Sequence, residues 1–191
     1  MAGPSDELMS RLLAMSKLTG SEDAMLKLIS DYEQRYPDDP MVHVLLGWSL
    51  TRLGRYDEAA SCFERALELN PKSAWAYFRK GELLQVQSMY KEALLCYIKA
   101  VKLKMHNPDF WLSKALMEDE LGRVEDALHS YEKSISLGEK SGWGWFWKSR
   151  ILLFQERFED SLEACLKAIE QNPEEEEFRQ LKDIVTERLG E

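Results

Sequence analysis

Residues 54–59, Gly-Arg-Tyr-Asp-Glu-Ala, return 68 residues later as Gly-Arg-Val-Glu-Asp-Ala at 122–127. Half of that interval is 34 residues, and related stretches stand one such step away: Ser-Met-Tyr-Lys-Glu-Ala at 88–93 and Glu-Arg-Phe-Glu-Asp-Ser at 156–161. The chain therefore repeats every 34 residues, with no insertion or deletion between copies. A fixed period of this length is typical of proteins that stack copies of one small structural unit.

The same register aligns large and small side chains in four copies, 40–73, 74–107, 108–141 and 142–175. One column holds mostly aromatic residues and another, three places on, holds only small residues. The aromatic column is Phe63, Tyr97, Tyr131 and Cys165, and the small column is Ala66, Ala100, Ser134 and Ala168. This alternation predicts two helices that cross closely at the small residues and bury their apolar faces against neighbouring copies.

The pattern resembles the tetratricopeptide repeat (TPR), a helix–turn–helix unit of 34 residues. Copy 40–73 carries the family's residues at Leu46, Gly47, Leu50, Ala59, Phe63, Ala66 and Pro71. The chain departs from the pattern at His43, Met105, Glu118 and Glu139. The resemblance implies an all-α fold, a right-handed superhelical α-solenoid of about eleven helices. In such a fold the first helix of each pair lines the concave wall.

Both ends fit the same array less closely. Residues 6–39 match the repeat poorly, and we interpret them as a degenerate first repeat, with an unrelated helical hairpin as the alternative. After Pro173, the apolar stripe of Phe178, Leu181, Ile184, Val185 and Leu189 predicts a capping helix over 176–191. Residues 1–191 are thus expected to form a single array.

Helix starts are marked by capping residues. Asp39 and Asn107 each precede a proline, which suits the first position of a helix. Ser73 and Ser141 are the N-caps expected for the other two copies.

Composition restricts the classes of function. The 191 residues carry a formal net charge of −9, which repels phosphate backbones and argues against nucleic-acid binding. We expect a cytoplasmic protein that does not enter a membrane, because no apolar run reaches the roughly 18 residues of a membrane span. The three cysteines, Cys62, Cys96 and Cys165, are far apart and are expected to be buried free thiols.

The resemblance also indicates where a ligand would bind. In the family, the second, fifth, ninth and twelfth positions of each repeat face the concave groove. Here these positions, with Arg79 beside them as an anchor for carboxylates, are unusually aromatic. The candidate peptide-binding residues are Trp48, Trp75, Phe78, Arg79, Leu112, Leu116, Trp143, Phe146 and Arg150. Exposed aromatic side chains often mark binding surfaces.

We therefore expect an adaptor that binds a peptide or an amphipathic helix of another protein. The alternatives are a scaffold that associates with copies of itself and a non-catalytic subunit of a larger complex. The groove aromatics also have a simpler interpretation, namely packing between successive first helices.

Nothing in the sequence points to catalysis, a cofactor or a metal. The histidines have no metal-ligand spacing, and His43 occupies a core position. The acidic pairs Glu118–Asp119 and Glu159–Asp160 are expected to lie on solvated helix faces. Lys80, Lys114 and Lys148 recur at one repeat position, where each stem is expected to lie over a neighbouring aromatic ring.

Overall fold

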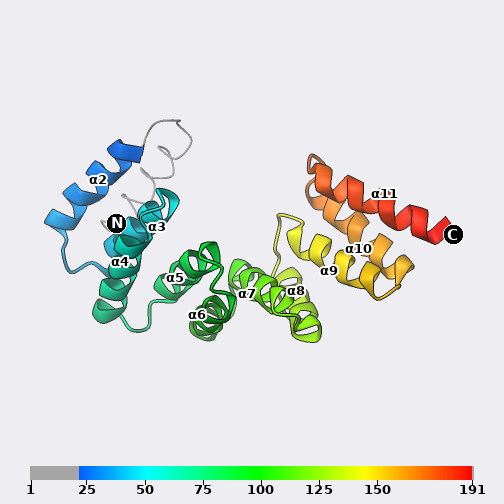
Figure 1. Cartoon of the computed structure of the whole chain (residues 1–191), viewed down its shortest axis with the longest axis horizontal. Helices are drawn as coiled ribbons and strands as arrows, with labels where there is room; N and C mark the ends of the chain where they lie inside the picture. The colour runs from blue at the N-terminus through cyan, green and yellow to red at the C-terminus, as the bar shows by residue number, and fades with distance from the viewer. Residues whose placement is uncertain (1–21, 191) are drawn as a thin grey trace. The chain divides into compact units, whose positions relative to one another are not determined.

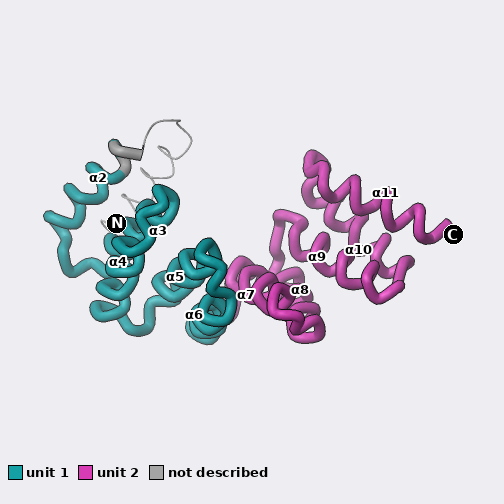
Figure 2. The backbone as a smooth tube through the Cα atoms, viewed as in Figure 1, with its two compact units in different colours: residues 1–104 teal, residues 105–191 magenta. Residues whose placement is uncertain are grey.

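The computed structural model describes residues 22–190, which form ten helices joined by short loops, with no strand in that range (Figure 1). The expected all-α helical-repeat fold is therefore confirmed. The chain divides into two compact units, residues 1–104 and residues 105–191 (Figure 2). The first half of the degenerate repeat, up to residue 21, lies outside the described residues, and the single continuous array remains a prediction.

Unit 1 contains α2 (Glu22–Arg35) followed by two helix pairs, α3 (Pro40–Arg52) with α4 (Tyr56–Leu69) and α5 (Ala74–Val86) with α6 (Tyr90–Leu103). The two helices of each pair pack on each other, and α5 also contacts both α3 and α4. The central core cluster is made of Leu50, Ala59, Phe63 and Leu83. Side chains from both pairs thus share one core, as expected for repeats that cannot bury their apolar faces alone.

Unit 2 contains the pairs α7 (Pro108–Glu120) with α8 (Val124–Ser136) and α9 (Trp143–Phe154) with α10 (Phe158–Gln171), followed by α11 (Glu176–Gly190). The last helix packs on α10 and α9, as a cap should.

Only part of the stripe predicted for α11 is covered. Phe178, Leu181 and Val185 are buried, whereas the side chain of Ile184 is 49% exposed. The prediction that Ile184 packs with the stripe was therefore wrong. Ile184 directly precedes Val185, so it points about 100° away from it around the helix.

The stretches that reveal the repeat begin at the turn between paired helices. Gly54 and Gly122 have φ values of +75° and +70°, a left-handed conformation in which a glycine has no steric penalty. The equivalent residues Ser88 and Glu156 adopt the same conformation, with φ of +60° and +59°. The turn geometry is therefore common to all four copies, although only two of them have the residue that adopts it without strain.

Small residues are required where the paired helices cross. A Cβ atom added to Gly47 would lie 2.7 Å from the ring of Phe63, and one added to Gly81 would lie 2.7 Å from the ring of Tyr97. Such distances are well below van der Waals contact. The aromatic ring of the second helix therefore packs directly onto the glycine of the first helix in both pairs.

Three of the four predicted caps are confirmed. The side chains of Asp39, Ser73 and Asn107 each accept a hydrogen bond from a backbone N–H in the first turn of the next helix. The fourth holds only in part, because the residue that directly precedes α9 is Gly142, in a left-handed conformation, while Ser141 Oγ accepts a hydrogen bond from the backbone N–H of Trp143 over 3.4 Å. There the buried carboxylate of Glu139 accepts hydrogen bonds from the backbone N–H of Ser141 (2.5 Å) and of Gly144 (3.4 Å).

Candidate functional site

The predicted site residues of unit 1 gather around one guanidinium group. Arg79 of α5 lies over the rings of Trp48 and Trp75, with 5.1 Å and 5.7 Å between its central carbon and the ring centroids. Its Nη1 also donates to Glu82 over 2.7 Å. Arg52, at the end of α3, lies 5.4 Å from the same Trp48 ring. These residues form the unit 1 cluster, in which half-exposed indoles are held by cations.

Phe78 does not belong to an exposed surface, although the repeat position predicted that it would. Its side chain is only 6% exposed. The ring packs 5.6 Å from that of Tyr97 and makes an edge contact at 5.8 Å with Trp75. Phe78 is therefore a packing residue, whereas Trp48 and Trp75 keep part of their surface open to a ligand.

Burial also changes the electrostatics of the unit 1 cluster. It raises the pKa of Glu82 above its usual value, although the ion pair with Arg79 acts in the opposite direction. Arg52, by contrast, is exposed and has no ion pair among the described residues. Arg52 is therefore the better candidate of the two arginines for pairing with a carboxylate of a ligand.

In unit 2 a run of aromatic side chains on α9 meets the capping helix. The rings of Phe146 and Phe178 are stacked with centroids 5.1 Å apart, and Trp143 makes an edge contact with Phe178 at 5.0 Å. Phe146 is only 6% exposed as a result. Its predicted place on an open surface was wrong, because Phe178 covers it, while Trp143 remains half-exposed.

The other predicted residues of unit 2 lie beside this run. The guanidinium of Arg150 is 4.5 Å from the ring centroid of Trp147. Trp147 was not among the binding residues predicted from the sequence. Leu112 and Leu116 are half-buried and pack against the core cluster of Tyr131. Trp143, Trp147 and Arg150 form the unit 2 cluster, which resembles the unit 1 cluster in combining indoles with an arginine.

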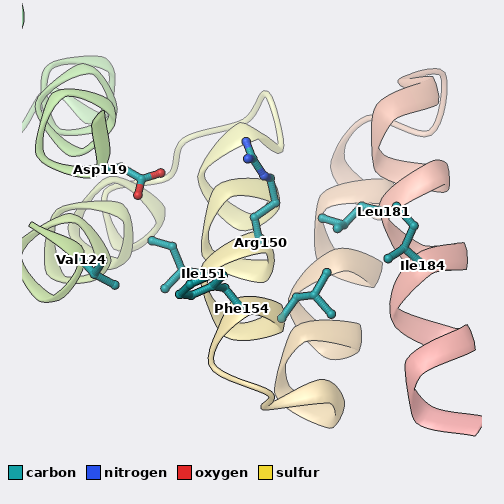
Figure 3. A pocket seen from close by; sticks show the side chains of 8 residues that line it. Asp119, Val124, Arg150, Ile151, Phe154, Leu181 and Ile184 are labelled. Carbon is teal, nitrogen blue, oxygen red and sulfur yellow. The ribbon is translucent and has the colours of Figure 1, made fainter. Parts of the chain in front are cut away.

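A pocket of about 520 Å³ also lies in unit 2 (Figure 3). It is lined by Asp119, Val124, Arg150, Ile151, Leu153, Phe154, Leu181 and Ile184. Only Arg150 among these had been chosen from the sequence. The signal in the sequence was weak, since the position of Phe154 is charged in the first and third full repeats (Arg52 and Glu120) but apolar in the second (Val86).

Glu118 and Glu159 were both predicted to lie on solvated helix faces, but their surroundings differ. Glu159 is exposed, but Glu118 is only 4% exposed, so its predicted place on a solvated face was wrong. Its carboxylate accepts hydrogen bonds from Lys114 Nζ (2.5 Å) and from Ser130 Oγ (2.6 Å). These two side chains supply the hydrogen bonds that a buried carboxylate requires.

The three lysines that recur at one repeat position also differ in the carboxylates with which they pair. Lys80 and Lys148 pair with Glu64 and Glu132 of the preceding helix, over 3.3 Å and 2.7 Å. The sequence has Ile98 where those glutamates stand, so Lys114 has no such carboxylate and pairs with Glu118 instead. The ammonium nitrogens of Lys114 and Lys148 lie 5.5 Å and 5.7 Å from the ring centroids of Trp111 and Trp145, whereas no such contact is found for Lys80 among the described residues.

The groups with chemical reactivity are isolated or protected. His43 is buried, and its Nε2 lies 2.8 Å from the carbonyl of Pro37, which confirms a satisfied core imidazole. Cys165 is a buried free thiol, while Cys62 and Cys96 are half-buried. Burial raises the pKa of Cys62 and of Cys165 to about 11, so neither is an activated nucleophile.

No cluster of His, Cys, Asp and Glu suited to a metal occurs within residues 22–190. In the same range no helix is long and apolar enough to cross a membrane.

Several solved structures share this fold. PilF of Pseudomonas aeruginosa is 14% identical over 98% of this chain and 85% of its own, with a TM-score of 0.86. A thermophilic TPR protein of Thermus thermophilus is 20% identical over 97% of both chains, with a TM-score of 0.70. YrrB is 20% identical over 85% of this chain and 84% of its own, also with a TM-score of 0.70.

No curated protein matches the sequence. Tetratricopeptide repeat models, however, match residues 40–73, 62–94 and 120–176, which together make up more than half of the chain. With the helix pairs and their small-on-large crossings, these matches show that the chain belongs to the tetratricopeptide repeat family, whose members are protein-interaction scaffolds.

Proposed function

We propose that this chain is an adaptor that binds a peptide or an amphipathic helix of a partner protein through the aromatic side chains of its first helices. Proteins of this family are in general non-catalytic interaction modules. YrrB, which shares the fold, is described as a TPR protein with an unusual peptide-binding site. That description shows that this fold can be used to hold a peptide.

The unit 1 cluster is the observation that carries the proposal. Trp48 and Trp75 are large apolar side chains that are only half-buried, although Trp75 packs in part against a core cluster, and Arg79 lies over both rings. Tryptophan and arginine are the residues most enriched among those that dominate binding energy. An indole whose conformation is fixed by a cation also loses little entropy when a ligand covers it.

The charges indicate the composition of the ligand. Exposed arginines without carboxylate partners among the described residues stand beside both clusters, Arg52 in unit 1 and Arg150 in unit 2. A segment that combines apolar side chains with Asp or Glu would cover the indoles and pair with these guanidinium groups.

A displayed library of random 15-residue peptides tests the proposal. Peptides enriched on the wild-type protein should bind Trp75→Ala protein about thirtyfold more weakly, which corresponds to about 2 kcal/mol for a hot-spot side chain. The matched control is Trp145→Ala, another half-exposed indole, which lies under Lys148 and Lys167 and belongs to neither cluster. Peptides that bind the Trp75→Ala and Trp145→Ala proteins equally well, or an absence of enriched peptides, would contradict the proposal.

Phe146→Ala is not a test of binding. Because the Phe146 ring is buried on Phe178, its removal should create a cavity and lower the stability of unit 2. Phe78 and Phe146 are the two buried members of the candidate set, so the binding residues that remain are Trp48, Trp75 and Arg79 in unit 1 and Leu112, Leu116, Trp143 and Arg150 in unit 2.

A further inference from the structure

The pocket of unit 2 opens on an apolar surface that the fold leaves uncovered. Ile151 and Phe154 come from α9, Leu181 and Ile184 from α11, and Val124 from the start of α8 (Figure 3). Its volume of about 520 Å³ lies within the range of roughly 300–1,000 Å³ found for binding pockets. A phenyl ring therefore fits inside it.

Phe154 makes this surface unusual. Its side chain is 87% exposed, while the next most exposed large apolar side chain of the described residues, Leu95, reaches 61%. Ile184 on the facing helix is 49% exposed. An apolar patch of this kind on a single chain marks an interaction surface, since burying it in a partner is favourable.

The pocket also holds one anion and one cation that do not pair with each other. No ion pair among the described residues involves Asp119 or Arg150, although both line the pocket. In unit 1 the equivalent of Asp119 is Gln85, which accepts a hydrogen bond from Tyr97 over 2.8 Å. Asp119 accepts no such bond, because the hydroxyl of Tyr131 has no partner within residues 22–190.

These charges restrict the partner. Burial already raises the pKa of Asp119 above its usual value, although Arg150 acts to lower it. A partner that covers the pocket removes more water from both groups, and a buried charge without a counter-charge is strongly unfavourable. The partner must therefore present a cation to Asp119, an anion to Arg150, and a large apolar side chain between them.

We propose that the partner is a second copy of this chain, bound across a two-fold axis at this pocket. In a two-fold contact both copies use the same surface. Each contact between one residue of the first copy and another residue of the second therefore occurs a second time with the copies exchanged. Phe154 of each copy enters the pocket of the other, and Arg150 of each pairs with Asp119 of the other. The chain thus supplies the apolar group and both charges. Peptide binding by the unit 1 cluster is a separate property and is not required for this contact, whereas a peptide carboxylate at the unit 2 cluster would compete with Asp119 of the second copy for Arg150.

Mass as a function of concentration tests the interface. Light scattering from 2 to 200 µM, in about 150 mM salt to screen the repulsion between chains of net charge −9, should show a mass that rises from 22.2 kDa toward twice that value. Phe154→Ser should weaken dimerisation thirtyfold or more. The matched control is Val86→Ser, which stands 68 residues earlier at the same repeat position and is 57% exposed.

A charge exchange then tests the geometry. Arg150→Asp would place two anions at each of the two symmetry-related contacts and Asp119→Arg would place two cations at each, so each variant alone should remain monomeric. Mixed in equal amounts, the two variants should form a heterodimer, because one copy then supplies both anions and the other both cations. Circular dichroism establishes that each variant is folded.

Three outcomes would overturn the proposal. The first is a wild-type mass that stays near 22.2 kDa at every concentration. The second is a Phe154→Ser protein that dimerises as tightly as the Val86→Ser protein, which would place the contact elsewhere. The third is a mixture of the two charge variants that stays monomeric while the wild type dimerises.

Discussion

Replacement of Glu118 by alanine should destabilise unit 2 far more than replacement of Glu159. The carboxylate of Glu118 is 4% exposed and accepts hydrogen bonds from Lys114 (2.5 Å) and Ser130 (2.6 Å). Lys114 Nζ also lies 2.7 Å from Ser130 Oγ, so the three groups form one closed polar cluster. Removal of the carboxylate leaves the ammonium group without its counter-charge in a site that water reaches poorly.

The magnitude follows from this geometry. Removing one partner of a buried ion pair costs about 3–5 kcal/mol. The lower end applies here, since the Lys114 side chain retains 15% exposure and can turn its ammonium group toward water. A loss of about 3 kcal/mol corresponds to a melting temperature lower by about 6–12 °C for a chain of this length.

Thermal unfolding followed by far-ultraviolet circular dichroism measures the effect. Glu159→Ala is the control, because that residue is exposed and its loss should change the free energy of unfolding by less than about 0.5 kcal/mol. A further variant, Glu118→Leu with Lys114→Met and Ser130→Ala, replaces the whole cluster by apolar groups and should recover most of the loss. The reasoning fails if Glu118→Ala and Glu159→Ala proteins melt at the same temperature.

Three other measurements test the fold. Glu156→Gly should raise stability by about 0.5–1 kcal/mol, because it relieves a non-glycine residue at φ +59°; a lower melting temperature would show that this turn is unstrained. Phe178→Ala should cost about 3–5 kcal/mol and Ile184→Ala less than about 1 kcal/mol, since only the first side chain is buried; equal losses in urea unfolding would contradict the packing of α11. Cys62, whose pKa is raised to about 11, should react with iodoacetamide at pH 8 about a hundredfold more slowly than a free cysteine. Its rate should rise about tenfold per pH unit toward pH 11 as the thiolate forms, and alkylation at the rate of a free thiol would show that Cys62 is not buried as described.

The repeat can be recognised from the sequence because the structural requirements that produce it are local. The left-handed turn at residue 54, the cap at Asp39 and the small residue at Gly47 each depend on neighbours within one helix pair. These requirements recur every 34 residues, so four imperfect copies were enough to reveal the family and the helix pairs.

The candidate site was predicted less completely than the repeat. Phe78 and Phe146 occupy a repeat position that the family exposes, yet here both rings are buried. Phe146 is covered by Phe178 of α11, which lies beyond the four repeats, whereas Phe78 packs on Tyr97 of its own helix pair. A rule based on repeat position alone carries no information about which aromatic rings lie beside that position.

The sequence by itself thus determined the helical repeat, its helix starts and its small-on-large crossings. Only the tertiary structure decided which aromatic side chains stay open to a partner, that Glu118 is buried with Lys114, and that Phe154 stands beside an uncovered pocket. The physical reason is that helix formation depends on residues three or four places apart, whereas burial depends on which distant helix covers a side chain.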